Sequence, residues 1–122
     1  MAPYERIEAW QASYGLGLAI IRATDRWPKR EMFGLSAQAR RAAYSVSLNI
    51  AEGVGKRGSR ELRRYLDIAL GSLFELEVIL RFAKDLEFSP AEEIVHLEEL
   101  RSKTGRLTWR FYESVGRAAK GI

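Results

Sequence analysis

The chain has 122 residues, of which 47% are hydrophobic and 30% are charged, a composition typical of one globular domain with a single core. We therefore expect one domain over residues 1–122. The absence of cysteine excludes disulfides and thiolate chemistry, and it agrees with a cytoplasmic location. The longest uncharged run, residues 9–21, is too short and too polar to span a bilayer, so we expect no association with a membrane.

The net charge of +4 is unevenly distributed along the chain. Residues 22–64 contain eleven Lys and Arg against four Asp and Glu, residues 65–100 contain two against nine, and residues 101–122 contain six against one. Fifteen of the twenty basic residues are arginine, whose guanidinium group suits bidentate contacts with phosphate or carboxylate. The pattern indicates a dipolar surface able to meet an anion, and ion pairing within or between subunits explains it equally well.

Two amphipathic helices are predicted in the first half of the chain. The first covers residues 6–26, and Trp27-Pro28 ends it because the residue before proline disfavours the helical conformation. Its expected buried face contains Ile7, Trp10, Tyr14, Leu18 and Ile21. The second covers residues 35–52 and ends at Gly53 and Gly55, since glycine is common at helix C-termini. Its expected buried face contains Leu35, Ala39, Ala42, Val46 and Ile50.

Two longer helices follow, over residues 59–86, with Ser59 as the N-cap, and over residues 90–118. Apolar side chains of the third helix alternate at spacings of four and three residues, which is typical of packing along one seam. This seam contains Leu62, Leu66, Ala69, Leu73, Leu76, Leu80 and Ala83. The fourth helix carries a stripe of Ile94, Leu97, Leu100, Leu107, Phe111 and Val115. Short connections predict an all-α, antiparallel, up-down-up-down four-helix bundle.

The third helix carries more apolar side chains than one seam requires, and further aromatic residues lie beside the stripe of the fourth helix. The candidate subunit-interface residues are Leu70, Phe74, Ile79, Phe82, Trp109 and Tyr112. Because four helices of this length cannot cover all of them, we expect a ring-like homo-oligomer. The alternative is a monomer with a thick core and ordinary exposed apolar side chains.

The sequence contains no recognisable catalytic set, so we expect no enzymatic activity, no cofactor and no small-molecule substrate. Glu93-x-x-His96 has the spacing found in helical di-iron proteins, but those sites need a second such motif, and His96 is the only histidine. We therefore expect no metal site. Residues 53–59 superficially resemble a phosphate-binding loop. Arg57, however, stands where a P-loop requires Ser or Thr after its lysine, and a helix precedes the loop where a P-loop has a strand.

Basic residues cluster around the connection between the second and third helices and recur in the fourth helix. In an antiparallel bundle these segments share one end of the molecule. The nucleic-acid-binding candidates are Lys56, Arg57, Arg60, Arg63, Arg64, Arg110, Arg117 and Lys120. Nearby carboxylates (Glu5, Glu8, Glu52, Glu61 and Glu113) reduce the excess, and a ring-like oligomer would multiply it. No aromatic platform interrupts these basic residues, so we expect electrostatic binding of RNA or another nucleic acid.

Three polar residues, Asn49, Ser72 and Glu75, fall on or near the predicted packing faces. They form either a buried cluster that fixes register or contacts a ligand, or ordinary caps and interhelical hydrogen bonds. Glu52 is expected to pair with Arg40 or Arg41, or to cap the following loop.

Many of the residues discussed above also belong to one family pattern that covers most of the chain. The matching residues are Glu8-Ala9-Trp10, Trp27-Pro28, Phe33-Gly34-Leu35, Gln38, Arg40-Arg41-Ala42-Ala43, Ser45, Asn49-Ile50-Ala51-Glu52-Gly53, Glu61, Leu66, Ile68-Ala69, Gly71-Ser72, Glu75-Leu76-Glu77 and Ala83-Lys84. On these residues the chain resembles the four-helix bundle proteins encoded in intervening sequences of bacterial 23S ribosomal RNA genes. One departure is Ser47-Leu48, where members commonly carry a proline.

The resemblance implies an all-α bundle that assembles as a homopentamer and has no established enzymatic activity. Asn49, Glu52, Gly53, Gly71, Ser72 and Glu75 belong to the motifs that carry the resemblance, and we expect them to form a structural motif. Two functions remain open. The first is binding of RNA or another nucleic acid through the arginine-rich surface, and the second is a scaffold that recruits a partner protein through apolar and acidic faces.

Overall fold

The chain consists of α-helices joined by short connections. The computed structural model describes residues 1–119, and no strand occurs among them. The elements are η1 (Pro3–Arg6), α1 (Glu8–Thr24), η2 (Lys29–Glu31), α2 (Leu35–Val54), α3 (Ser59–Asp85) and α4 (Ala91–Ala119), where η marks a short 3-10 helix. The prediction of an all-α fold with four helices is confirmed. None of the helices over residues 1–119 is both long enough and apolar enough to cross a lipid bilayer.

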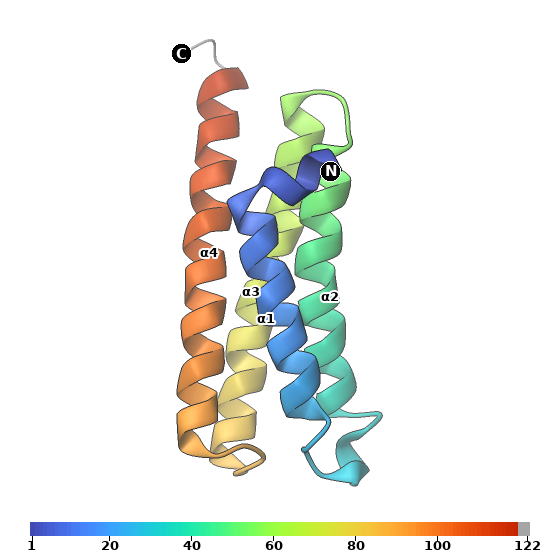
Figure 1. Ribbon diagram of the computed structural model, residues 1–122, viewed down its shortest axis with the longest axis vertical. Helices are drawn as coiled ribbons and strands as arrows, with labels where there is room; N and C mark the ends of the chain where they lie inside the picture. Colours follow the sequence, from blue (N-terminus) through green and yellow to red (C-terminus); the bar gives the residue numbers. More distant parts are fainter. Residues whose placement is uncertain (120–122) are drawn as a thin grey trace.

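The four α-helices pack side by side, and each contacts two others: α1 with α2, α2 with α3, α3 with α4, and α4 with α1 (Figure 1). The connection between α2 and α3 lies at the upper end of the bundle in Figure 1, where α4 reaches Ala119. The connections between α1 and α2 and between α3 and α4 lie at the lower end. Basic residues of the α2–α3 connection and of the last turns of α4 therefore come to one end.

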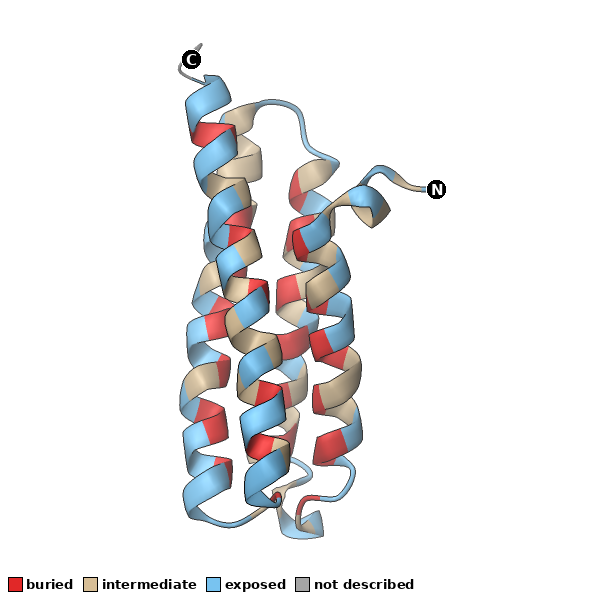
Figure 2. Cartoon of the chain, turned by 60° about the vertical axis from the view of Figure 1, so that its left-hand side comes forward, coloured by how far each residue is buried: buried red, intermediate tan, exposed pale blue. Residues whose placement is uncertain are grey.

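Buried residues form a stripe along each helix that faces the other helices (Figure 2). Six of the seven residues of the seam predicted for α3 are buried, and Leu62 is half-buried. Four of the five residues predicted for α2 are buried, with Leu35 half-buried. The stripe of α4 is buried at Ile94, Leu97 and Val115 and half-buried between them. Helical periodicity therefore predicts the inward faces of these three helices.

The predicted inward face of α1 is only partly correct. Four of its five residues are half-buried (Ile7, Trp10, Leu18 and Ile21), and the most buried side of the helix lies next to them. Leu16 and Ile20 are fully buried, whereas Tyr14, which we expected inside, is 52% exposed. The buried face carries small side chains such as Ala9 and Ser13, which allow neighbouring helices to approach. The larger rings lie outside, where the ring of Trp10 stacks on that of Tyr14 with centroids 5.2 Å apart. Apolar residues surround most of α1, so the pattern alone does not identify its buried side.

Helix ends differ from the prediction for identifiable reasons. The first α-helix begins at Glu8 because Ile7 is extended (φ −84°, ψ 120°) after the η1 turn. Gly53 does not end α2, which continues to Val54. A Cβ at residue 53 would lie only 2.8 Å from the Cβ of Tyr65 in α3, so glycine at this position permits α2 and α3 to approach closely. Gly58, with φ +87°, precedes α3, and Ser59 is its first residue rather than its cap.

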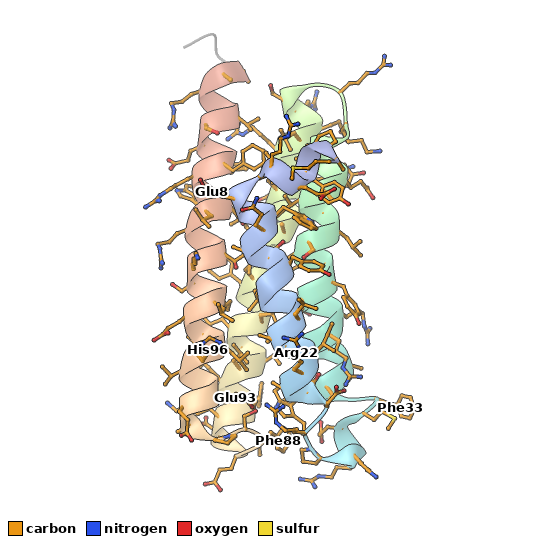
Figure 3. The ribbon with its side chains drawn as sticks, in the orientation of Figure 1. Glu8, Arg22, Phe33, Phe88, Glu93 and His96 are labelled. Atoms are coloured by element: carbon orange, nitrogen blue, oxygen red, sulfur yellow. The ribbon has the colours of Figure 1, made fainter. Side chains whose placement is uncertain are left out.

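At the lower end, the connection after α1 is joined to the start of α4. Trp27 is buried, and its Nε1 donates a hydrogen bond of 2.7 Å to the Oγ of Ser89. Arg26 forms an ion pair with Glu93, which lies beside Phe88 at this end in Figure 3. Arg40 Nη2 lies 2.6 Å from Asp25 Oδ1, so Arg40 pairs with Asp25. Of the alternatives for Glu52, pairing with Arg40 is therefore wrong.

Candidate nucleic-acid interface

The most accessible cations of the candidate interface lie in the α2–α3 connection and the first turn of α3. Lys56, Arg57 and Arg60 are all exposed. Gly58 positions them, because its positive φ turns the chain from the end of α2 directly into α3. None of these three side chains makes an ion pair within the described residues, so their charges are free to meet an anion.

Arg64 is exposed and contacts two neighbours on its own helix, Glu61 and Tyr65. Its Nη2 lies 3.2 Å from Glu61 Oε2, and this hydrogen-bonded partner raises the pKa of the guanidinium. Its Cζ lies 4.5 Å from the centroid of the Tyr65 ring, and Lys56 Nζ lies 5.6 Å from the same centroid. Because exposed ion pairs contribute little to stability, Arg64 can exchange Glu61 for a phosphate.

Arg63, in contrast, is a packing residue between α3 and α4. Its Cζ lies 4.2 Å from the centroid of the Tyr112 ring, within the range of a cation–π contact. A Cβ at Gly116 would lie 3.0 Å from the same Cζ, so the guanidinium occupies the space above this glycine. Its Nε is buried and has no hydrogen-bond partner. Arg63 is therefore less accessible to a polyanion than its neighbours, which the sequence alone did not indicate.

The candidates on α4 extend the basic surface along that helix. Arg110 and Arg117 are exposed and lie seven residues, or about 10 Å, apart along the axis. Lys120 lies outside the described residues. Exposed Glu52 and Glu113 reduce the excess of positive charge at this end of the bundle.

The structure places aromatic rings beside the cations of the α2–α3 connection and of α3, which the order of residues in the sequence did not predict. Tyr65 lies under two cations, and Tyr112 lies under Arg63. The ring of Trp109 stacks on that of Tyr112, with centroids 5.5 Å apart and planes inclined by 19°. The i, i+3 spacing of these two aromatic residues was visible in the sequence, but the position of Tyr112 beside Arg63 of α3 depends on helix packing.

The polar residues Asn49 and Ser72 have a structural role that links α2 to α3. Asn49 Nδ2 donates to the backbone oxygen of Ser45 (2.7 Å) and to its Oγ (3.0 Å). Ser72 Oγ donates to the same Ser45 Oγ at 2.7 Å. Glu75 is exposed on the outer side of α3 and does not join this cluster, contrary to the prediction. Gly71 is also exposed, and a Cβ there would meet nothing within 4 Å.

The candidate subunit-interface residues divide into three groups. Ile79 is 5% exposed and belongs to the core, so its assignment to an interface is wrong; its side chain packs inward with the seam of α3. Leu70 and Tyr112 are half-buried against the core. Phe74, Phe82 and Trp109 are exposed, with 68% of the Phe74 surface accessible. Half or more of each of these three residues therefore remains exposed within one subunit.

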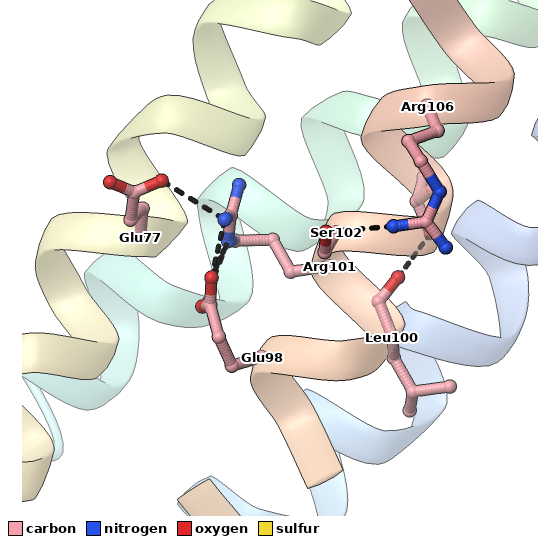
Figure 4. A network of polar contacts seen from close by, with 7 residues as sticks. Glu77, Glu98, Leu100, Arg101, Ser102 and Arg106 are labelled. Atoms are coloured by element: carbon pink, nitrogen blue, oxygen red, sulfur yellow. Dashed lines mark hydrogen bonds and ion pairs between the residues drawn. The ribbon is translucent and has the colours of Figure 1, made fainter. Parts of the chain in front are cut away.

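The polar network between α3 and α4 is structural. Arg101, whose side chain is 12% exposed, places Nη2 2.9 Å from Glu77 Oε2 and Nε 2.9 Å from Glu98 Oε2 (Figure 4). The hydrogen bonds that Arg101 donates to the Glu98 carboxylate raise the pKa of the guanidinium. Glu93 of the Glu-x-x-His motif pairs with Arg26, and His96 is exposed. Among residues 1–119, no three His, Asp or Glu side chains lie close enough together to hold a metal ion.

Comparison with known families gives one match. A family model described as "23S rRNA-intervening sequence protein" matches residues 5–109. The matched span includes α1, α2 and α3 completely and α4 as far as Trp109. The resemblance predicted from the sequence motifs is thereby confirmed. No curated protein matches the chain.

Proposed function

The chain belongs to the 23S rRNA-intervening sequence protein family, and from this premise we propose that it is a non-enzymatic, self-associating bundle that binds RNA electrostatically. The observation that carries the proposal is the group of exposed, unpaired cations Lys56, Arg57 and Arg60 at one end of the bundle. Arg64 and Arg117 extend this group, and together these five residues are called the basic end below.

The antiparallel, up-down-up-down order supports the proposal, because it brings the α2–α3 connection beside the last turns of α4. Contacts between particular residues agree with this order. Gly53 of α2 lies against Tyr65 of α3, and Arg63 of α3 lies against Tyr112 and Gly116 of α4. In a ring-like oligomer, here a homopentamer by family resemblance, the basic ends of several subunits would form one cationic surface.

Self-association is supported by the uncovered apolar side chains. Monomeric proteins rarely expose contiguous apolar patches of more than a few hundred Å². Here the exposed large side chains include Phe74, Val78 and Phe82 along one side of α3, and Tyr14 and Leu48 on α1 and α2. A second subunit that covers these residues would remove them from water.

The test compares two variants with equal loss of charge. One replaces Lys56, Arg57, Arg60 and Arg64 with alanine, and the matched control replaces exposed Lys29, Arg30, Arg81 and Lys84 with alanine near the opposite end. Affinity for single-stranded RNA is measured between 50 and 200 mM salt, a range in which phosphate-binding proteins lose affinity strongly. Each lost phosphate contact should reduce the slope of log K against log salt by about 0.7.

The first variant should therefore lose up to about three units of slope, while the control keeps the slope of the wild type. An equal reduction of this slope in both variants would show that RNA binding depends only on the net charge of the protein, and it would contradict a localised site. Absence of RNA binding by the wild type at low salt would exclude the proposed function.

A scaffold for a partner protein is the second candidate, because exposed Phe74 and Val78 lie beside the carboxylate of Glu75 on the outer side of α3. Such a face fits a partner with a basic and apolar surface. This function predicts a protein ligand whose binding is unchanged by loss of the basic end and is weakened by Phe74→Ser. Loss of binding in the basic-end variant alone would exclude it.

A further inference from the structure

Two of the apolar depressions on the surface of the subunit lie on different helix pairs and near its exposed aromatic side chains. The first, which we call the α1/α2 groove, has a volume of about 330 Å³ and is lined by side chains that include Trp10, Tyr14, Tyr44 and Leu48. The second, the α3/α4 hollow, has a volume of about 510 Å³ and lies between Phe74 and Trp109. Both are open to solvent, and residues at their edges are among the most exposed apolar residues of the chain.

The two depressions face away from each other. The helices contact one another in the cyclic order α1, α2, α3, α4, so the pair α1/α2 forms one side of the bundle and the pair α3/α4 forms the opposite side. One copy can therefore use both surfaces at once, with a different neighbour on each side. A contact between unlike surfaces continues from copy to copy and closes into a ring when the rotation permits.

The shapes of the two surfaces are complementary. The α1/α2 groove has protruding walls, since Tyr44 and Leu48 are 49% and 66% exposed. The α3/α4 hollow contains Gly71 and Gly105, and a Cβ at either would meet nothing within 4 Å. Glycine in a helix interior is less favourable than alanine, and no contact within residues 1–119 requires it at these positions. The two glycines leave space that can accommodate a protruding side chain of another copy.

The charges beside the two surfaces are opposite. Arg22 and Arg41 flank the α1/α2 groove, one after Ile21 on α1 and the other one turn before Tyr44 on α2. Asp67 lines the α3/α4 hollow, and Glu75 follows Phe74. Arg101 also lines the hollow, but its charge is paired with Glu77 and Glu98. Arg22, Arg41, Asp67 and Glu75 are exposed, and none of these four makes an ion pair within residues 1–119. A contact between two grooves or between two hollows would bring like charges together, whereas a contact between a groove and a hollow would bring opposite charges together.

We propose that the α1/α2 groove of one copy binds the α3/α4 hollow of the next copy in a head-to-tail contact. Phe74 and Trp109 pack against the aromatic walls of the groove, and Tyr44 or Leu48 enters the space above Gly71 and Gly105. This inference rests on the proposed self-association and specifies which surfaces make it.

The test uses two variants that each disable one surface. Leu48→Glu places a charge in the groove, and Phe74→Glu places one at the hollow; both positions are exposed, so the subunit should fold normally, which circular dichroism checks. Each variant alone should be a monomer by light scattering. An equimolar mixture should double in mass, because one variant keeps an intact hollow and the other an intact groove. Met32→Glu, at an exposed apolar residue in the α1–α2 connection, is the matched control and should assemble like the wild type.

Each result separates this inference from the proposed function. If each variant alone forms dimers and mixing adds nothing, like surfaces pair and the head-to-tail contact is wrong. If both variants assemble as the wild type does, other surfaces make the oligomer; the inference then fails while self-association stands. A monomeric wild type would overturn both.

Discussion

The contact between α2 and α3 depends on a residue without a side chain, Gly53, and we predict that Gly53→Ala destabilises the fold. A Cβ at residue 53 would lie 2.8 Å from the Cβ of Tyr65 and 3.1 Å from Cδ1 of Leu62. The leucine methyl group can move by a rotamer change. The Cβ of Tyr65 is attached directly to the backbone of α3, so it can move only if the helix moves.

Two opposing effects determine the size of the change. Alanine in place of glycine gains up to about 1 kcal/mol of helix propensity, and less at residue 53 because α2 ends at Val54. Overpacking that requires a backbone shift costs about 1–3 kcal/mol. We therefore expect a net loss of about 1–2 kcal/mol, because the rigid contact with Tyr65 outweighs the gain in propensity.

The assay is urea denaturation followed by circular dichroism at a fixed protein concentration. Gly15→Ala is the matched control, because Gly15 lies inside α1, is exposed, and would place its Cβ within 4 Å of nothing. This control should gain about 0.5–1 kcal/mol, so the same substitution should have opposite signs at the two positions. Equal stability of the two variants would refute the argument that α2 and α3 approach too closely for a side chain at residue 53.

Three further predictions concern buried polar groups, and each is measured by the same denaturation assay. Ser89→Ala should cost about 1–3 kcal/mol, because it leaves Nε1 of Trp27 buried without an acceptor, and Ser89→Thr should restore most of the loss. Thr104→Val should change stability by less than about 1 kcal/mol, since its fully buried hydroxyl bonds only to a helical carbonyl at i−4; a larger loss would contradict this. Arg101→Met should cost about 1 kcal/mol at low salt and less at high salt, because its carboxylate partners are partly exposed and can be hydrated; a salt-independent loss would assign the effect to packing.

Much of the fold follows from local regularities in the chain. The 4-3 spacing of apolar residues in α3 predicts its buried seam because 3.6 residues per turn place such positions on one side of any helix. The motif Asn49-Ile50-Ala51-Glu52-Gly53 indicates the family because it consists of residues adjacent in the chain, and the matching family model includes it. The apolar stripe of residues 35–50 predicts α2. The exposed cations Lys56 and Arg57 were also predicted, because a charged loop between two helices remains in water.

Other features depend on which residues of different helices meet. The buried side of α1 could not be predicted from apolar periodicity, because small residues such as Ala9 and Ser13 form it while Tyr14 remains outside. Shape complementarity between α1 and its neighbouring helices determines which side of α1 is buried. Such complementarity belongs to a pair of surfaces and is not visible in the sequence of one helix. The roles of Gly53 and Arg63 differ from the prediction for the same reason. The Cβ of Tyr65 in α3 approaches the glycine, and the ring of Tyr112 in α4 packs against the arginine. Periodicity along one helix therefore predicts that the helix is amphipathic, and contact with its neighbours selects the face that is buried.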